Sequence, residues 1–565
     1  MIKINDPLAN LISPLDAFYQ RVQQSPDSLC FVQPLGEGRV EQYTWSRASD
    51  EVRSMAAYLL SLELPPGSHI ALFSKNCAQW IMADLAIWLA GHVTIPIYPT
   101  LSAESIRQIM QHSGSQLVFI GKLDNWEEMQ DGIAENIPRV CFSSSPDAVK
   151  AECLCWDKVL TEFTPFAQSP SPDLDALATI VYTSGTTGMP KGVMHSFRTM
   201  GTTGLLAGEL YQSGGADRFL SYLPLAHAAE RASVEVCQFY RGFAIYFCHS
   251  LDTFAEDLLR ASPTLFFAVP RIWTKLQQGV FAKLSPRVLN TLMMVPGVSG
   301  LLGRKILGKM GLGNVRIAIS GAAPLSTSLL AWYRKLGLEI LEGYGMSENF
   351  AYSHTSQLGE SKMGYVGTAN PYVDCRIADS GEILIHSPTN MLGYYKDPEQ
   401  TRATLDEKGY LHTGDIGTID QRGRLKITGR IKEIFKTSKG KYVTPAPIEN
   451  RLLSNTNVEQ VCVTGASLPQ PIALVNLSAV AMKKLDSSED GKQEIINSFS
   501  DLLNELNGIV DKHENLQCLV IVREIWGVEN NFTTPTLKIR RNTIDEYYGK
   551  FYQSWVDSGN KVIVV

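Results

Sequence analysis

The segment Tyr182–Gly192, with the sequence YTSGTTGMPKG, concentrates hydroxyl groups, glycines and one lysine in a short stretch. Glycines let the backbone approach an anion closely, hydroxyls add hydrogen-bond donors, and a lysine adds a mobile positive charge. A run of this composition is often only a flexible linker. Two features argue against a linker here. The apolar residues 177–181 directly before it predict a buried strand, and Pro190 stiffens the loop beside Lys191. We therefore predict that the segment binds phosphate groups.

A nucleotide-hydrolase P-loop, G-x-x-x-x-G-K-[ST], does not fit this segment. Lys191 follows Pro190 and precedes Gly192, so the hydroxyl that would bind magnesium is missing from its place. The segment instead resembles the signature loop of the adenylate-forming superfamily, which includes acyl-CoA synthetases, luciferases and the adenylation domains of peptide synthetases. The resemblance implies that this loop holds the phosphates of ATP and that Thr183 is also a metal ligand. The residues implied are Thr183, Ser184, Gly185, Thr186, Thr187, Gly188 and Lys191.

Two later segments could hold an adenine ring. Residues 319–325, ISGAAPL, predict a strand that ends in small residues, which leaves a flat slot beside the backbone. Residues 341–348, LEGYGMSE, place Tyr344 between two glycines, where its ring could stack on a purine. Alone, such a Gly-Tyr-Gly string usually marks a turn. The nucleotide-binding residues predicted from the two segments are Gly321, Ala322, Ala323, Pro324, Gly343, Tyr344, Gly345, Met346 and Ser347.

Charged groups that could complete a nucleotide site are spread over the second half of the chain. Glu348 suits Mg²⁺, which typically takes one or two carboxylates plus substrate phosphates. Asp415, in LHTGDIG, is predicted to occupy a tight turn and to accept both ribose hydroxyls, with Arg430 supporting the same ribose. The resemblance implies that Lys538, in NFTTPTLKIRR, enters from a small domain and bridges the reacting carboxylate and the α-phosphate. These roles make Lys538, Glu348 and Thr183 candidate catalytic residues, with Glu348 and Thr183 as the Mg²⁺ ligands.

The string SYLPLAHAAER, residues 221–231, resembles the long-chain acyl-CoA synthetases among adenylate-forming enzymes. A lone histidine usually has no chemical role, but the resemblance implies that His227 borders the acyl pocket and makes it a fourth candidate catalytic residue. Arg231 stands where some long-chain enzymes carry a tryptophan that gates the acyl tunnel, so it is a second candidate for the pocket. The resemblance also implies a pivot at Lys432 and a CoA-facing loop beyond it. The candidates there are Lys432, Lys436, Lys439 and Gly440.

The elements that would position these residues alternate along the first 170 residues. Helices are predicted over 43–62, 78–90 and 102–113, and strands over 69–73, 93–98 and 116–120. Residues 163–176, rich in Pro and Ser, are predicted to be an exposed linker. Such alternation favours parallel sheets covered by helices. The predicted fold class is α/β: a large N-terminal domain of parallel or mixed sheets layered with helices plus a distorted β-barrel subdomain, and a small mobile α+β C-terminal domain.

A chain of 565 residues is too long for one hydrophobic core. Residues 416–428 predict a hairpin, and the charged run after it suggests a boundary that divides the chain into a large domain, 1–430, and a small domain, 431–565. The small domain is predicted to mix strands over 460–464 and 518–522 with a helix over 494–507.

Composition is that of an ordinary globular protein, and a net charge of −6 argues against nucleic-acid binding. Ten cysteines without a paired zinc spacing suggest a reducing cytosol, and no signal peptide is evident. The most apolar stretch, 81–99, contains Asp84 and two prolines and is predicted to be a buried helix running into a strand. We therefore expect a cytoplasmic protein.

One stretch is unusually basic. Residues 258–338 contain no Asp or Glu but eleven Lys and Arg. This is either an ordinary solvated basic face or a surface that attracts anionic lipid headgroups or the phosphates of a bulky substrate. The stretch is thus a candidate for peripheral membrane contact.

Taken together, the motifs predict an AMP-forming long-chain fatty-acid–CoA ligase that uses Mg²⁺, with ATP and coenzyme A as co-substrates. The chain has no G-x-S-x-G elbow, which counts against a thioesterase or lipase. Three alternatives stay open at this point. The first is an enzyme of the same fold that loads a carrier protein or stops at the adenylate (an acyl-ACP synthetase or fatty-acyl-AMP ligase). The second is a nucleotide hydrolase that releases phosphate. The third is a non-catalytic scaffold that binds acyl groups or nucleotides.

Overall fold

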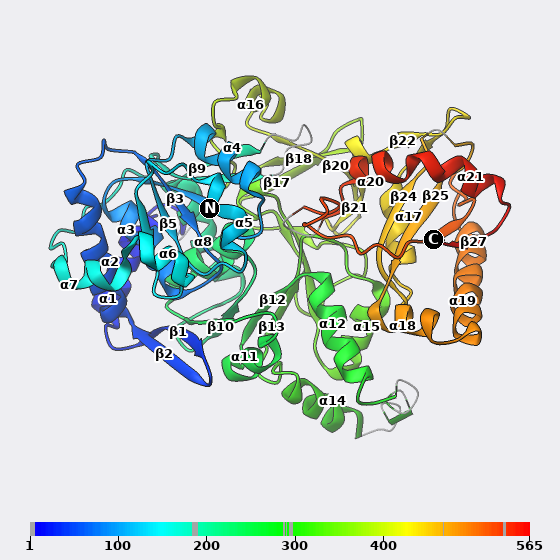
Figure 1. The fold of residues 1–565 in the computed structure, drawn as a ribbon, viewed down its shortest axis with the longest axis horizontal. Helices are drawn as coiled ribbons and strands as arrows, with labels where there is room; N and C mark the ends of the chain where they lie inside the picture. The colour runs from blue at the N-terminus through cyan, green and yellow to red at the C-terminus, as the bar shows by residue number, and fades with distance from the viewer. Residues whose placement is uncertain are drawn as a thin grey trace.

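The computed structural model describes residues 6–183, 190–285, 289, 291–292, 298–466, 468–534 and 538–565. Two large mixed sheets and their covering helices make up the N-terminal part (Figure 1). The first sheet has the order β19-β9-β8-β4-β3-β5-β6-β7. Its strands are β3 His69–Phe73, β4 Val93–Ile97, β5 Leu117–Ile120, β6 Arg139–Cys141, β7 Leu154–Cys155, β8 Leu177–Thr183, β9 Lys191–Ser196 and β19 Gly393–Tyr394. Strands β3 to β8 run parallel, as the alternating pattern predicts.

The second sheet has the order β16-β15-β14-β13-β12-β10-β11-β1-β2. Its strands are β1 Leu29–Gly36, β2 Arg39–Thr44, β10 Arg218–Ser221, β11 Ala244–Phe247, β12 Leu265–Ala268, β13 Ile317–Ser320, β14 Ile340–Tyr344, β15 His354–Thr355 and β16 Thr368–Ala369. The main helices around the two sheets are α1 Pro14–Gln24, α2 Trp45–Ser61, α3 Ala78–Leu89, α4 Ala103–Ser113, α8 Phe197–Leu210, α10 Cys237–Arg241, α11 Phe254–Ala261, α12 Pro270–Phe281, α14 Val298–Lys309 and α15 Thr327–Leu336.

A third, four-stranded antiparallel sheet follows in the chain. It consists of β17 Asp374–Ile377, β18 Glu382–His386, β20 Leu411–Ile419 and β21 Leu425–Arg430, in that spatial order. The predicted hairpin is confirmed, since β20 and β21 pair from Asp415 and Arg430 to Ile419 and Leu425. Helix α16, Pro398–Thr404, lies between β19 and β20 in the chain.

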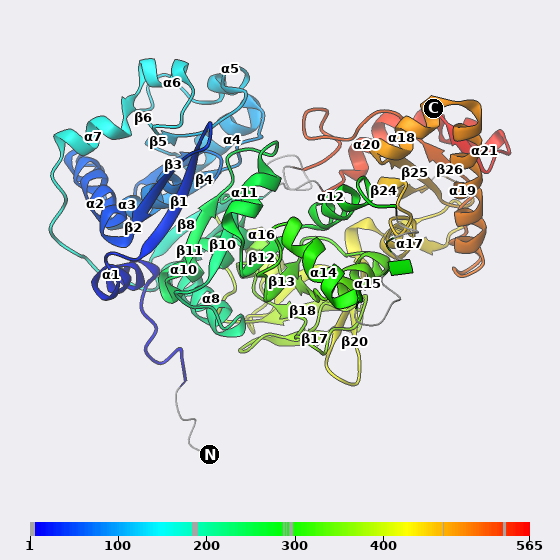
Figure 2. The same cartoon turned by 90° about the horizontal axis from the view of Figure 1, so that it is seen from below.

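Residues 431–565, here called the C-terminal part, form a smaller body at the right of Figures 1 and 2. A four-stranded sheet, β24-β25-β26-β27, forms its centre. Its elements are η4 Ile431–Glu433, β22 Phe435–Lys436, β23 Tyr442–Val443, α17 Pro445–Leu452, β24 Val458–Thr464, β25 Ile472–Leu477, α18 Ala479–Ser487, α19 Glu489–Asn507, β26 Leu519–Ile521, α20 Arg541–Tyr548, α21 Tyr552–Asp557 and β27 Val562–Val564. The predicted fold class, a large α/β part and a smaller C-terminal one, is confirmed.

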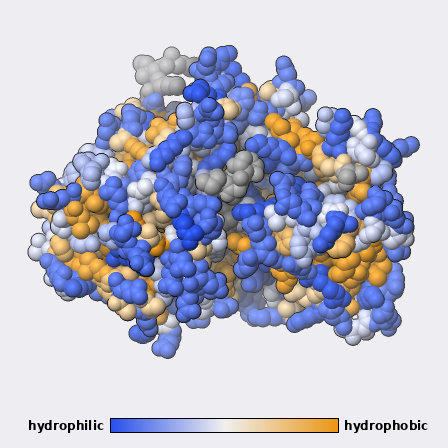
Figure 3. Space-filling view, turned by 45° about the horizontal axis from the view of Figure 1, so that its top comes forward, coloured by the Kyte–Doolittle hydropathy of each residue, from blue (hydrophilic) through white to orange (hydrophobic). Residues whose placement is uncertain are grey.

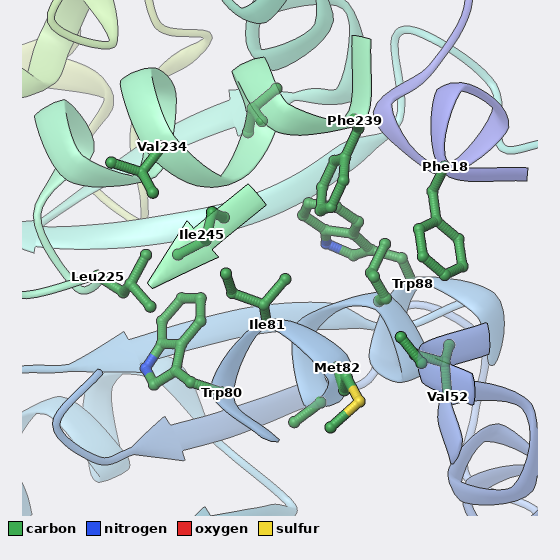
Figure 4. Close-up of a cluster of buried hydrophobic side chains, with 14 of the residues drawn as sticks. Phe18, Val52, Trp80, Ile81, Met82, Trp88, Leu225, Val234, Phe239 and Ile245 are labelled. Carbon is green, nitrogen blue, oxygen red and sulfur yellow. The ribbon is translucent and has the colours of Figure 1, made fainter. Parts of the chain in front are cut away.

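The two large sheets share a core that contains α3. All residues of α3 are buried, and Figure 4 shows its Trp80, Ile81 and Trp88 facing Val234 and Ile245 from the other sheet's layer. The prediction of a buried helix running into a strand over 81–99 is therefore confirmed. A helix that is apolar on every side has no solvent face, so it belongs between layers rather than on the surface.

Helix starts are the main local errors of the sequence prediction. The helix predicted from Tyr43 begins at Trp45, because the Thr44 hydroxyl accepts a hydrogen bond from the Arg47 amide at 3.2 Å and caps the helix. Tyr43 instead lies on β2, paired with Phe31. Likewise α19 begins at Glu489 rather than at residue 494, because the Ser488 side chain caps it.

Within the described residues, no helix combines the length and the apolar character needed to cross a membrane. On the face seen in Figure 3, hydrophilic residues predominate and apolar ones form separate patches.

Candidate active site

The predicted phosphate-binding segment begins and ends on two paired strands. Thr183 is the last residue of β8 and pairs with Lys191, the first residue of β9. The two residues predicted to bind metal and phosphate are therefore brought together where β8 ends and β9 begins. The other predicted residues of this segment, Ser184, Gly185, Thr186, Thr187 and Gly188, lie outside the described residues.

Lys191 has well-defined neighbours. Its Nζ donates a hydrogen bond to Gln400 Oε1 at 2.8 Å and lies 5.3 Å from the centre of the Tyr394 ring. Burial lowers the pKa of Lys191, and the nearby Lys432 lowers it further, while Asp397 and Glu348 act in the opposite direction. Lys432, predicted as a pivot from the sequence, thus lies within electrostatic range of Lys191.

Glu348 lies in η3, Ser347–Asn349, shortly after β14. The Tyr394 hydroxyl donates a hydrogen bond to Glu348 Oε1 at 2.8 Å, and the Met391 amide donates to the Glu348 carbonyl at 2.7 Å. In the described part of the chain, no cluster of three His, Cys, Asp or Glu residues could hold a metal by itself. A Mg²⁺ ion here would therefore depend on Glu348 plus substrate phosphates, which is the usual mode for this ion. The residues present fit that mode.

Asp415 is the centre of a hydrogen-bonded group. Arg430 Nε donates to Asp415 Oδ1 at 2.6 Å, and the Tyr344 hydroxyl donates to Asp415 Oδ2 at 2.7 Å. Burial and the nearby Asp415 raise the pKa of Tyr344, so its hydroxyl stays protonated and donates. The predicted tight turn around Asp415 is wrong. The residue lies within β20, opposite Arg430 on β21, and only Gly414 before it takes a left-handed conformation, with φ +70°.

The two segments predicted to hold adenine lie side by side. Strands β13 and β14 are parallel neighbours, so residues 321–324 and 345–347 follow two adjacent carboxyl ends of one sheet, where α/β folds commonly bind ligands. Ala322 has φ +67°, an uncommon conformation for a residue with a side chain, and such strain gathers at functional sites. A Cβ at Gly345 would lie 2.6 Å from the Ala351 backbone, so this close approach requires glycine. Gly321, Gly343, Ala323, Pro324, Met346 and Ser347 accompany them in the same two segments.

Lys538 comes from the C-terminal part and reaches these groups. In Figure 1 the red chain before α20 extends towards β20 and β21. The Lys538 side chain is solvent-accessible, but many protein atoms lie around it. Loss of hydration caused by these atoms is the main reason why the pKa of Lys538 is lowered. Arg430 lowers the pKa further, while Asp415 and Glu348 act in the opposite direction. The charges of residues far apart in the sequence are therefore gathered around one amine.

His227 lies close to Lys538, in the same group of residues. Burial, together with the charge of Lys538, lowers the pKa of His227 to about 4, so its imidazole is neutral near pH 7. Its Nδ1 accepts a hydrogen bond from the Ala229 amide at 3.1 Å, which fixes the ring orientation. His227 therefore lies beside the predicted catalytic lysine without acting as a charged group.

Arg231 lies inside the core, so its contacts do not support its predicted place in the acyl pocket, which stays a prediction. Its side chain is fully buried and forms ion pairs with Asp84 and Glu235, and its Nη1 donates to Thr179 Oγ1 at 2.6 Å. The guanidinium also lies within 6 Å of the rings of Trp80 and Trp88. A guanidinium with this many partners inside the core holds elements together rather than facing a substrate.

The predicted CoA-facing loop is separate from this group. Lys436 lies on β22, with its Nζ 5.6 Å from the Tyr442 ring centre, and Lys439 and Gly440 form the turn before β23. Gly440 has φ +78°, which that turn requires. Among the described residues, no hydrogen bond or ion pair joins Lys436, Lys439 or Gly440 to the residues around Lys538.

Three residues of the site were not predicted. Tyr394 and Gln400 contact Glu348 and Lys191, as described above. His195 Nε2 lies 2.8 Å from the Ser347 carbonyl, directly before Glu348, and burial lowers the His195 pKa to about 3, so the neutral ring donates this bond. None of the three stands in a glycine-rich or charged motif. The pairing of β19 with β9 brings Tyr394 to the site, and α16, which follows β19, brings Gln400.

The comparisons with known proteins agree with this geometry. Residues 18–395 match the family described as AMP-binding enzyme, and residues 432–550 match the AMP-binding enzyme C-terminal domain. The chain therefore belongs to the AMP-binding enzyme family, which confirms the resemblance inferred from its motifs.

Curated relatives and solved structures narrow the comparison. The chain is 30% identical to long chain acyl-CoA synthetase 7, peroxisomal, of Arabidopsis thaliana, over 91% of this chain and 82% of that protein. It is 29% identical to the long-chain-fatty-acid–CoA ligase FadD15 of Mycobacterium tuberculosis, over 94% of each chain. Its fold matches the A-PCP didomain of carboxylic acid reductase from Segniliparus rugosus, solved in complex with AMP, with a TM-score of 0.81 at 20% identity over 97% of this chain and 82% of that one. It also matches the anthranilate CoA ligase AuaEII, with a TM-score of 0.77 at 18% identity over 96% and 98%.

Proposed function

We propose that this protein is an AMP-forming ligase that activates a long-chain fatty acid with ATP and transfers the acyl group to coenzyme A. The observation that carries the proposal is the gathering of Lys538, Glu348, Asp415 and Arg430 from both parts of the chain around one position. The relatives named as long-chain acyl-CoA synthetases and ligases support the choice of acid and acceptor.

In the first step, a carboxylate oxygen of the fatty acid attacks the α-phosphorus of ATP. The bond between the α-phosphorus and the bridging oxygen breaks, and pyrophosphate leaves with the electron pair. Two anions must approach for this attack, so the site has to supply positive charge and hold the reactants in line. Lys191 and Lys538 would supply that charge at the two ends of the triphosphate, and Asp415 with Arg430 would hold the ribose. A Mg²⁺ ion held by Glu348 and Thr183 would neutralise further phosphate charge.

In the second step, the thiol of coenzyme A attacks the acyl carbonyl and AMP leaves. The acyl-adenylate is a mixed anhydride, so this step needs no nucleophilic side chain. We propose that the C-terminal part rotates about Lys432 between the steps. Rotation would withdraw Lys538 and bring the loop with Lys436, Lys439 and Gly440 to the site.

The test is a product analysis with saturated fatty acids of increasing chain length, ATP and Mg²⁺. We expect equal amounts of AMP and pyrophosphate, highest with long chains, and acyl-CoA by mass spectrometry once coenzyme A is added. Orthophosphate in place of pyrophosphate would indicate a hydrolase and refute the proposal. Acyl-adenylate that forms but reacts only with a phosphopantetheinylated carrier protein would assign the carrier-loading alternative instead.

We also propose that α14 contacts anionic lipid surfaces. Four basic residues of the acid-free stretch already pair with acids elsewhere: Arg260 with Asp257, Arg271 with Glu459, Arg316 with Asp217 and Arg334 with Glu339. Arg304, Lys305 and Lys309 on α14 have no ion pair with any described residue. They share its exposed face with Leu301, while Ile306, Leu307 and Met310 face the core. Three cations beside an exposed apolar side chain suit a headgroup surface.

Co-sedimentation with phosphatidylcholine vesicles, with and without phosphatidylglycerol, tests this contact. Each basic residue near a charged bilayer contributes about 1 kcal/mol. Replacing Arg304, Lys305 and Lys309 together by glutamine should therefore abolish most binding to the mixed vesicles. A control variant with Lys158, Lys408 and Lys426 changed to glutamine should bind like wild type. Equal binding by both variants would refute the contact.

A further inference from the structure

The segment from Met391 to Thr404 runs along both the Lys191 strand and Glu348. Its strand β19 pairs with β9, with the Leu392 amide donating to the Met194 carbonyl at 2.9 Å and the Tyr395 amide to the Gly192 carbonyl at 2.8 Å. The Met391 amide donates to the Glu348 carbonyl. The backbone of this segment thus ties the start of β9 to the candidate metal carboxylate.

Tyr394 lies between the two charged groups. Its hydroxyl donates to Glu348 Oε1, and the Lys191 ammonium lies over its ring. The position of Tyr394 is itself constrained, because its amide donates to Thr401 Oγ1 at 2.9 Å and its side chain is buried. The Tyr394 hydroxyl therefore occupies Oε1 of Glu348 and leaves Oε2 for a ligand.

Gln400, on α16, holds the lysine itself. Lys191 Nζ donates to Gln400 Oε1 at 2.8 Å, and Gln400 Nε2 donates to Thr404 Oγ1 at 3.0 Å. The second bond orients the amide so that its oxygen faces the lysine. The Asp397 side chain accepts a hydrogen bond from the backbone N–H of Gln400 at 2.9 Å and caps the helix, which fixes the backbone of Gln400. The Lys191 ammonium is thus bound to a neutral acceptor that a fixed helix presents.

A phosphate oxygen is a better acceptor for an ammonium group than an amide oxygen, because its negative charge adds an ion–ion attraction to the hydrogen bond. The Lys191–Gln400 bond can therefore be exchanged for a bond to a triphosphate. Lys191 Nζ has three N–H donors, and turning the ammonium so that several of them face a triphosphate would weaken or break the bond to Gln400, so Gln400 competes with ATP.

We propose that α16 carries a clasp on the nucleotide site: Gln400 holds Lys191 in the ATP-free protein and competes with ATP for its ammonium group, while Tyr394 aligns the Glu348 carboxylate for the metal that accompanies ATP. Both are positioning residues. The inference rests on the proposed function only in taking ATP as the ligand of Lys191.

The clasp predicts opposite effects of two substitutions at one position. Gln400→Ala removes the competing acceptor, so ATP should bind about 2- to 10-fold more tightly, the range for the net worth of one hydrogen bond. Gln400→Glu replaces the amide by a carboxylate that pairs with Lys191, so ATP should bind about 10-fold more weakly. A residue with a purely structural role would weaken binding in both variants.

Calorimetric titration of the full chain with α,β-methylene-ATP and Mg²⁺ measures these changes without turnover. Both effects should disappear when Lys191→Ala is added, since the competition acts through that ammonium. Weaker binding by Gln400→Ala, or the same change in the Lys191→Ala background, would refute the clasp. If wild type binds the analogue and both Gln400 variants bind it equally well, only this inference fails. If wild type does not bind it, the proposed function fails as well.

Tyr394→Phe keeps the ring and removes the bond to Glu348. The analogue should then bind about 5-fold more weakly in Mg²⁺, while its binding in EDTA should not change. Tyr395→Phe is the matched control, since no hydrogen bond from the Tyr395 hydroxyl to a described residue is formed, and it should match wild type in both buffers. An equal loss for Tyr394→Phe with and without Mg²⁺ would contradict the role given to Tyr394.

Discussion

Replacing Lys538 with alanine is expected to slow acyl-adenylate formation by about 100-fold or more, the scale of losing one preorganised donor at a developing charge. Thiolysis of acyl-adenylate supplied from outside should change little. The reason is positional: Lys538 belongs to the C-terminal part and lies within electrostatic range of Glu348, Asp415 and Arg430, and it would leave the site when that part rotates.

The two half-reactions can be measured separately by pyrophosphate release and by acyl-CoA formation from synthetic acyl-AMP. Lys512→Ala, at an exposed lysine of the same part, is the matched control and should leave both rates unchanged. A loss of the same size in both half-reactions would show that Lys538 does not act in the first step alone, and would count against the rotation.

The contacts between the two parts are compatible with such a rotation. Arg271 on α12 pairs with Glu459 on β24 at 3.0 Å, and the Arg271 side chain is largely exposed. An exposed ion pair contributes only about 0–1 kcal/mol, so this pair is too weak to hold the C-terminal part in one orientation. Arg541, by contrast, bonds Glu449 at 2.6 Å and lies 3.8 Å from Glu433, all within the C-terminal part. We infer that Glu433, directly after Lys432, would move with that part.

The sequence predicted the elements whose signals are local. Strand β3 is a short apolar run with the predicted limits, His69–Phe73, and α4 begins within one residue of the predicted start, where Ser102 accepts from the Ser105 amide. The motif residues Lys191, Glu348, Asp415 and Lys538 could be named because glycines and charges at fixed spacing mark them. Their roles stay predictions, but the structure brings them together.

What the sequence did not predict depends on pairing and packing between distant segments. Asp415 was placed in a turn because glycines flank it, yet the register of β20 with β21 keeps it in a strand opposite Arg430. Tyr394 and Gln400 carry no local signal, because their partners are 46 and 209 residues away in the chain. Arg231 was assigned by its position in a motif, and only the packing of α3 against the other sheet's layer shows what it contacts.

Arg231→Met is expected to cost about 3–5 kcal/mol of stability, the range for breaking a buried ion pair by removing one partner. Arg231, Asp84 and Glu235 are all fully buried, and Asp84 also accepts a hydrogen bond from Thr94. Burial and the neighbouring Asp84 raise the pKa of Glu235 well above its usual value, and its Oε1 has no hydrogen-bond partner among the described residues. Without the guanidinium, the Asp84 charge would stay in the core with no cation beside it.

Urea unfolding followed by tryptophan fluorescence measures the cost, because Trp80 and Trp88 flank the guanidinium. Arg198→Met is the matched control: it removes a pair with Asp175 at the surface and should cost no more than about 1 kcal/mol. Adding Asp84→Asn and Glu235→Gln to Arg231→Met should recover much of the loss, since no charge would then remain buried. If Arg231→Met were as stable as Arg198→Met but preferred fatty acids of a different length, Arg231 would belong to the acyl pocket after all, and the core role derived from its contacts would be wrong.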